Sequence, residues 1–254
     1  MGSRIIAIAF AGGVACGLAL AQAGGNLVDR TQARPSPSPN LTPEARGDIM
    51  MARKMYREAI ESFQQEPQKT AVVYNKIGIA YHQLQQLPNA KKNYEQALKL
   101  KRDYAEALNN VGTVYYAQKS YRRAIGYYQR ALRISQSASI YSNLGTAYFA
   151  RKRYKEATDA YQEAYNRDPD VFEHKSNYGT LLEDRNVEER AKFHYYLAKM
   201  YAKSGRNELA LQYVRKALEE GFKERNKLTE DPEFQALRDT PEFKELLALE
   251  PRVL

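Results

Sequence analysis

Small and aromatic residues return at a fixed spacing along residues 43–220. Five glycines stand 31 to 34 residues apart, and each is followed by an alanine after twelve residues and an aromatic residue after sixteen. The five sets are Gly47/Ala59/Phe63, Gly78/Ala90/Tyr94, Gly112/Ala124/Tyr128, Gly145/Ala157/Tyr161 and Gly179/Ala191/Tyr195. Residues three or four apart share one face of an α-helix, so the pattern predicts repeated helices with one apolar face each.

The residue types predict how these helices pack. Small residues allow two antiparallel helices to approach closely, and the aromatic residues fill the space between one helix pair and the next. A single pair cannot bury its apolar face alone, so the pairs are expected to stack. The sequence therefore predicts an all-α fold in which antiparallel helix pairs form a solenoid.

This pattern resembles the tetratricopeptide repeat family, whose unit of about 34 residues is a pair of helices. The resemblance covers about residues 43–220 and implies a right-handed superhelical solenoid of about five to six units. Two positions depart from the family pattern: Glu66 replaces the last alanine of the first unit, and Leu182 replaces the tyrosine of the fifth. We expect units near residues 40–70, 71–104, 105–137, 138–171 and 172–205, and a last pair at 188–220.

The helix expected at residues 188–203 fits two places in the repeat. Ala191, Tyr195 and Ala198 match the second helix of the fifth unit, whereas Leu197, Ala198 and Tyr201 match a first helix. We interpret this helix as shared between two units, which allows an odd number of helices.

The last segment, residues 221–254, is predicted to form short capping helices. It contains two similar stretches, DPEF at 231–234 and TPEF at 240–243. Asp231 and Thr240 are expected as N-caps, with proline at the first helical position. Terminal units of a solenoid need such a cover for their apolar face.

The N-terminal residues predict export. Residues 1–21 combine Arg4, an apolar stretch from Ile5 to Ala21 and small residues before a cleavage position, which is the composition of a secretory signal peptide. An uncleaved membrane anchor is the alternative. Residues 22–42 are rich in proline and serine and are expected to form a flexible tether. We therefore expect a periplasmic or extracellular protein, which is either released by cleavage of the signal peptide or held at the membrane by the uncleaved segment.

Composition argues against catalysis. The only cysteine, Cys16, lies in the signal segment, and the formal net charge is +9. No phosphate-binding loop, nucleophile motif or paired metal ligands stand out, so we expect no enzyme activity, no cofactor and no metal site. The basic balance favours anionic partners, and export argues against nucleic acid as one of them.

The family resemblance implies that the first helix of each unit lines a concave groove, and that the residue two before the glycine faces it. Asparagine occupies that position in three successive units, and its amide can both donate to and accept from a peptide backbone. Packing between helices is the alternative explanation for these asparagines. The predicted groove residues are Lys76, Ile79, His82, Asn110, Tyr116, Asn143, Phe149 and Asn177.

Cations recur between the two helices of the first, third and fourth units. Stacking would align them along one edge of the solenoid, where they could meet an anionic membrane surface or an acidic protein. A solvated edge without a partner is the alternative. This basic edge consists of Arg53, Lys54, Arg57, Lys119, Arg122, Arg123, Arg151, Lys152, Arg153 and Lys155.

These features together predict a non-enzymatic scaffold or adaptor that holds a peptide or protein segment in its groove, in the cell envelope. In this respect the chain resembles bacterial exported and periplasmic tetratricopeptide repeat proteins. The alternative is a structural envelope protein that self-associates or attaches by its edge to a membrane. The partner and the oligomeric state do not follow from the sequence.

Overall fold

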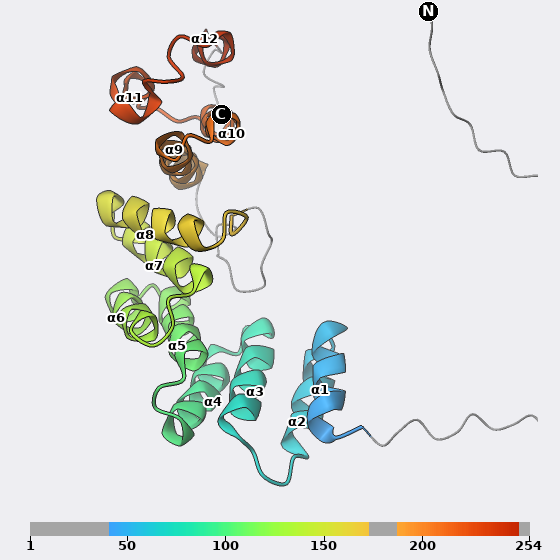
Figure 1. Cartoon of the computed structure of the whole chain (residues 1–254). Coiled ribbons are helices and arrows are strands. Elements are labelled where there is room, and N and C mark those ends of the chain that lie inside the picture. The colour runs from blue at the N-terminus through green and yellow to red at the C-terminus, as the bar shows by residue number, and fades with distance from the viewer. Residues whose placement is uncertain (1–40, 173–186, 249–254) are drawn as a thin grey trace, which may run out of the picture. The chain divides into compact units, whose positions relative to one another are not determined.

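The computed structural model describes residues 41–172 and 187–248, all within one compact unit, Leu41–Leu254. The described residues form helices and no strand (Figure 1). The expected signal peptide, Asn177 and the expected tether up to residue 40 lie outside them, while Thr42 at the end of the tether is the N-cap of the first helix. The helices are α1 (Pro43–Ala52), α2 (Tyr56–Gln64), α3 (Ala71–Gln83), α4 (Leu87–Leu100), α5 (Ala105–Ala117), α6 (Tyr121–Leu132), α7 (Ala138–Ala150), α8 (Tyr154–Arg167), α9 (Val187–Lys203), α10 (Asn207–Glu219), α11 (Asn226–Glu230), the 3-10 helix η1 (Pro232–Phe234) and α12 (Pro241–Ala248).

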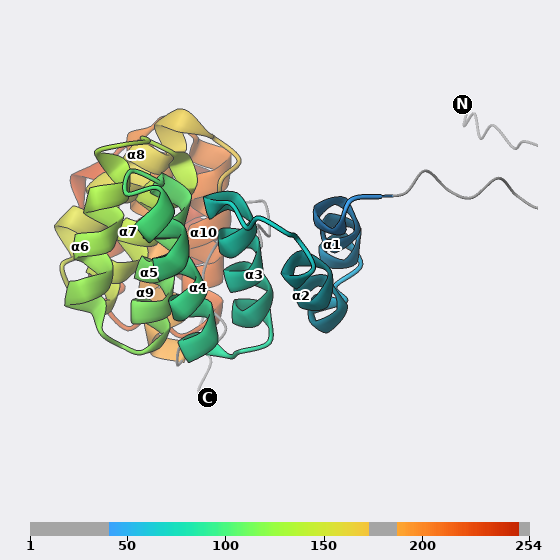
Figure 2. The ribbon, with the colours of Figure 1, turned by 90° about the horizontal axis from the view of Figure 1, so that it is seen from below.

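The helices pack as consecutive pairs, which confirms the predicted solenoid. The first helix of each pair, α1, α3, α5, α7 or α9, packs on the second helix that follows it (Figures 1 and 2). Each second helix from α2 to α8 also contacts the next first helix in the chain. The first helices α3, α5 and α7 touch one another in turn and so form a continuous face.

The repeated glycines are required by the aromatic residues sixteen positions later. A Cβ atom at Gly47, Gly78, Gly112 or Gly145 would lie 2.3–2.6 Å from a ring carbon of its partner, far inside van der Waals contact. These partners are fully buried or nearly so: Phe63, Tyr94, Tyr128 and Tyr161. In the last pair the same register positions hold Ala198 and Val214. Alanine can therefore replace the glycine in the last pair, because valine replaces the aromatic residue sixteen positions later.

The turn inside each pair has one geometry throughout the described units. In the third unit Lys119 N–H donates to Tyr116 O at 2.8 Å and Ser120 N–H donates to Tyr115 O at 2.8 Å, which is the Schellman arrangement. It requires a left-handed residue, with φ of 57–60° at the non-glycine positions and 71° at Gly205. The non-glycine residues that adopt it are Lys54, Gln85, Lys119 and Lys152.

Because left-handed backbone is unfavourable for any residue with a Cβ atom, we expect Gln85→Gly to stabilise the protein. The expected gain in the free energy of unfolding is about 0.5–1 kcal/mol. Lys92→Gly, at an exposed position inside α4, should instead lower it by about 1 kcal/mol. Urea denaturation measures both changes, and a loss of stability in Gln85→Gly would contradict the turn geometry.

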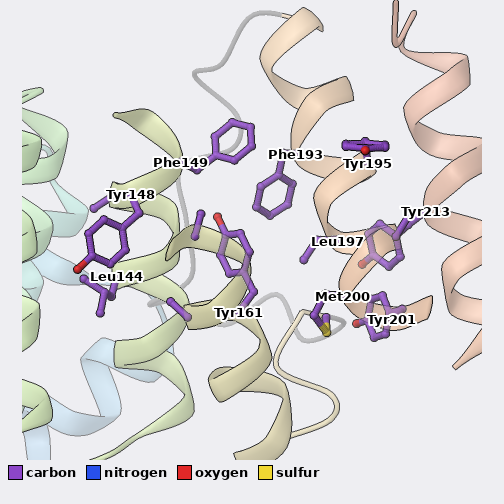
Figure 3. Packing of buried hydrophobic residues seen from close by; sticks show 14 of the residues in the cluster. Leu144, Tyr148, Phe149, Tyr161, Phe193, Tyr195, Leu197, Met200, Tyr201 and Tyr213 are labelled. Atoms are coloured by element: carbon purple, nitrogen blue, oxygen red, sulfur yellow. The ribbon is translucent and has the colours of Figure 1, made fainter. Parts of the chain in front are cut away.

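The core is continuous across the junction between α8 and α9. Phe193 of α9 lies edge-on to Tyr161 of α8 and to Phe149 of α7, with ring centroids 5.5 and 5.8 Å apart (Figure 3). Within the described residues α9 has the first-helix role, since it pairs with α10 through the turn at Gly205. Its second-helix role in the fifth unit involves residues 173–186, which lie outside the described part, and stays a prediction.

The C-terminal segment packs on the last pair. The ring of Tyr195 stacks on that of Phe222, with their centroids 4.4 Å apart. The Phe234 ring lies next to those of Tyr195 and Phe243, with centroids 6.0 Å apart in each case. Asp231 stands at the N-cap position of η1 with Pro232 next, as expected, but its side chain makes no capping hydrogen bond. Its carboxylate accepts hydrogen bonds from the Tyr195 hydroxyl and, at 2.8 Å, from Lys199 Nζ, because η1 is a single 3-10 turn held against α9.

Candidate binding face and basic edge

Polar side chains join the first helices at one repeated register. In the second, third and fourth units, the residue two before the glycine donates to the residue three before the glycine of the preceding unit. Lys76 Nζ contacts Glu44 Oε1 at 2.7 Å, Asn110 Nδ2 donates to Asn75 Oδ1 at 3.0 Å, and Asn143 Nδ2 donates to Asn109 Oδ1 at 3.0 Å. We call these three pairs the polar ladder. It ties α1 to α3, α3 to α5 and α5 to α7.

The asparagines of the ladder are buried. Asn110 and Asn143 are 6% and 5% exposed, and Asn109 Nδ2 makes a further contact with Asn110 Oδ1 at 3.4 Å. Buried polar groups need such partners, because an unsatisfied amide is costly away from water. The alternative explanation of helix packing therefore holds for Asn110 and Asn143, while their contact with a ligand stays a prediction.

The three acceptors of the ladder, Glu44, Asn75 and Asn109, were not predicted as partners of the residues two before the glycines. The second unit has Lys76 at the expected position, and the amide that receives Asn110 comes from Asn75, one residue earlier. Lys76 itself turns to α1, where it pairs with Glu44 and Asp48 at 2.7 Å each. Burial opposes the charge of Lys76, but hydrogen bonds from the ammonium group to these two carboxylates raise its pKa. Lys76 therefore stays protonated at neutral pH.

We expect Asn110→Ala to destabilise the fold, because it leaves Asn75 Oδ1 without its donor and Asn109 Nδ2 without its acceptor. The expected loss in the free energy of unfolding is about 1–3 kcal/mol. Asn89→Ala is the control: its exposed amide bonds only to exposed Gln86, so a change below about 0.5 kcal/mol is expected. Equal urea midpoints for the two variants would contradict the ladder.

The other predicted groove residues divide into two groups. Ile79, His82 and Tyr116 are half-buried on α3 and α5 and leave part of their surface open to a ligand. Burial lowers the pKa of His82, so its imidazole is neutral at pH 7. Phe149 is only 4% exposed, because the rings of Tyr154, Phe193 and Tyr196 enclose it.

All ten side chains of the basic edge are exposed. They lie at or directly after the turns between α1 and α2, α5 and α6, and α7 and α8. Arg153 differs from the others because it forms a close ion pair with Glu156 and lies 4.6 Å from the centre of the Tyr148 ring. The corresponding turn of the second unit, Gln85 to Pro88, carries no charge.

Residues 41–172 and 187–248 contain neither a cluster of metal-ligating side chains nor a helix that could cross a membrane. In these ranges no group of three or more His, Cys, Asp or Glu side chains is placed to hold a metal ion. No helix in them is both long and apolar enough to cross a membrane.

Comparisons with known proteins agree on the repeat. The sequence model of the tetratricopeptide repeat matches residues 44–103 and 103–170, and a second model of the same repeat matches residues 175–222. A chloroplast tetratricopeptide repeat domain-containing protein, PYG7 of Arabidopsis thaliana, is 30% identical over 93 residues, which cover 34% of this chain and 31% of that protein. The uncharacterized protein ycf37 of Porphyra purpurea is 29% identical over 104 residues, which cover 36% of this chain and 60% of that protein.

Solved structures share the fold at low sequence identity. The Cut9 and Hcn1 hetero-tetramer of APC/C has a TM-score of 0.51 at 18% identity, over 81% of this chain and 35% of that chain. MamA from Desulfovibrio magneticus RS-1 has a TM-score of 0.49 at 18% identity, over 78% of this chain and 96% of that chain. The chain belongs to the tetratricopeptide repeat family, whose helical scaffold is typical of protein–protein interaction.

Proposed function

We propose that this chain is a non-catalytic scaffold that binds a segment of another polypeptide along the face formed by α3, α5 and α7. The observation that carries the proposal is the register of these helices, which the polar ladder locks together at Asn75–Asn110 and Asn109–Asn143. A face held rigid in this way loses little conformational freedom when a ligand binds, which favours affinity.

The side chains beside the ladder suit an extended segment. Ile79 and Thr113 occupy the same position on α3 and α5, as do His82 and Tyr116, and all four are half-buried. Packed helix axes lie about 8–10 Å apart, and an extended chain advances about 3.3 Å per residue. Ligand residues three positions apart would therefore contact equivalent positions on the first helices of successive units. The mixed polar and aromatic surface favours this mode over an amphipathic helix, which requires a wide apolar groove.

The proposal includes a place in the cell envelope. It rests on residues 1–21, whose composition is that of a signal peptide or anchor. A fusion of these residues to a reporter that is active only outside the cytoplasm would test export directly. A reporter that stays inactive would place the scaffold inside the cell and leave the binding face unchanged.

Two tyrosines provide a matched test of the binding face. Tyr116 of α5 and Tyr127 of α6 are both half-buried, and each has a ring neighbour at similar distance, Tyr121 at 5.3 Å and Tyr115 at 5.4 Å. The full chain should capture a partner from its host, and Tyr116→Ala should lose that partner while Tyr127→Ala retains it. Retention by both variants, with wild-type thermal stability, would contradict binding at this face.

A further inference from the structure

A pocket of about 370 Å³ opens at the basic edge between two successive units. Its volume lies within the range of about 300–1,000 Å³ that is usual for small-ligand sites. Four of its lining residues carry a positive charge: Lys119 comes from the turn between α5 and α6, two arginines come from the start of α6, and the fourth comes from the turn between α7 and α8. The lining residues are Lys119, Ser120, Tyr121, Arg122, Arg123 and Arg151.

No negative charge balances these cations within the neighbouring sequence. Residues 107–155 contain nine lysines and arginines and no aspartate or glutamate. In the part of the chain that the structure describes, none of Lys119, Arg122, Arg123 and Arg151 has a carboxylate within ion-pair distance. Arg153, next to this group, is paired with Glu156. Four of the nine positive charges in residues 107–155 therefore line the pocket without a carboxylate partner.

The pocket also contains the start of a helix. Tyr121, Arg122 and Arg123 are the first residues of α6, which has twelve residues, and the positive end of its dipole adds to the four side-chain charges. Ser120 is the N-cap residue, yet its hydroxyl makes no capping hydrogen bond. Ser120 lines the pocket, and a serine hydroxyl is a suitable donor to an anion.

The backbone at Lys119 supports a role for the turn. Lys119 takes a left-handed conformation, φ 57°, at the position where Gly205 stands in the last pair. A lysine there costs stability that a glycine would not. The same conformation occurs at Lys54, Gln85 and Lys152, so it belongs to the repeated turn, and at Lys119 it places a cation at the pocket.

We infer that this pocket binds a phosphate-bearing anion. Four cations and a helix start suit the charge and the several acceptor oxygens of a phosphate group better than a single carboxylate, and guanidinium groups match phosphate oxygens in pairs. The phosphate can come from the head group of an anionic lipid or from a free phosphate compound. A lipid surface would meet the remaining cations of the basic edge as well, whereas a free anion requires the pocket alone.

Two arginine pairs of α6 provide a matched test. Arg122→Gln/Arg123→Gln removes two charges at the pocket, and Arg130→Gln/Arg133→Gln removes two exposed charges near the other end of the same helix. Each arginine pair also includes one guanidinium group that lies over a tyrosine ring. Cζ of Arg123 is 5.6 Å from the centre of the Tyr115 ring, and Cζ of Arg130 is 5.0 Å from the centre of the Tyr127 ring. Thermal unfolding of both variants establishes that they fold.

Binding of the full chain is measured to vesicles of 30% phosphatidylglycerol in phosphatidylcholine, and to inorganic pyrophosphate, at low and physiological salt. We expect the pocket variant to bind about 30-fold more weakly, and the control variant within about threefold of wild type. If the pocket variant loses affinity for the vesicles alone, the pocket binds lipid head groups. If it loses affinity for both the vesicles and pyrophosphate, the pocket binds free phosphate compounds. The inference is overturned if wild type binds neither probe, or if both variants weaken binding equally.

Discussion

Phe234→Ala is expected to lower the free energy of unfolding by about 3–5 kcal/mol, which is the usual cost of truncating a buried aromatic residue. The Phe234 side chain is fully buried, and its ring contacts Tyr195 of α9 and Phe243 of α12. Because each unit of a solenoid contacts only its neighbours, the damage should be greatest at the C-terminal end. Hydrogen exchange should therefore accelerate in α9 and α10 more than in α3 and α5.

The control for this prediction is Lys244→Ala, whose side chain is 61% exposed in α12. It should change the unfolding free energy by less than about 0.5 kcal/mol. If Phe234→Ala accelerated exchange equally in every helix, the solenoid would unfold as one cooperative body. If it had no effect on α9 and α10, residues 221–254 would not serve as a cap.

Gly112→Ala and Gly126→Ala are expected to change stability in opposite directions. A Cβ atom at Gly112 would lie 2.6 Å from Cε1 of the Tyr128 ring, which is itself buried and cannot move aside freely. Overpacking of this kind costs about 1–3 kcal/mol. A Cβ atom at Gly126 would meet nothing within 4 Å. There the better helix propensity of alanine should stabilise α6 by about 1 kcal/mol.

Urea denaturation of these two variants measures the difference. A double variant makes the cause explicit: Gly112→Ala should cost less in a Tyr128→Val background than in the wild type, since Ala198 and Val214 hold the same register positions in the last pair. The close approach of α5 and α6 would be contradicted if Gly112→Ala stabilised the protein as much as Gly126→Ala.

The fold could be predicted from the sequence because its rule is local and repeated. The glycine and the aromatic residue sixteen positions later recur together, and their contact requires both at once, as the Gly112–Tyr128 pair shows. The turn conformation was harder to predict. Lysine or glutamine stands where the backbone is left-handed, and no glycine marks that position in four of the described units.

The candidate site was predicted less completely, because its contacts join different units. The pair Asn110–Asn75 depends on the offset between α3 and α5, which no spacing within one helix reveals. The side-chain partners of Asp231 could not be predicted for the same reason, since Tyr195 and Lys199 lie over thirty residues away. A search for polar residues three before each glycine would have found Glu44, Asn75 and Asn109, which receive the donors of the ladder.

Site-specific photo-crosslinking is the measurement that tests the scaffold proposal most directly. A photoreactive residue is placed at position 79 or 113 on the proposed face, or at the exposed positions Lys92 of α4 and Gln212 of α10 as controls. We predict that positions 79 and 113 capture the same segment of one partner in the host, at sites about three residues apart. Crosslinks from α4 and α10 alone, or none from positions 79 and 113, would contradict binding along α3 and α5.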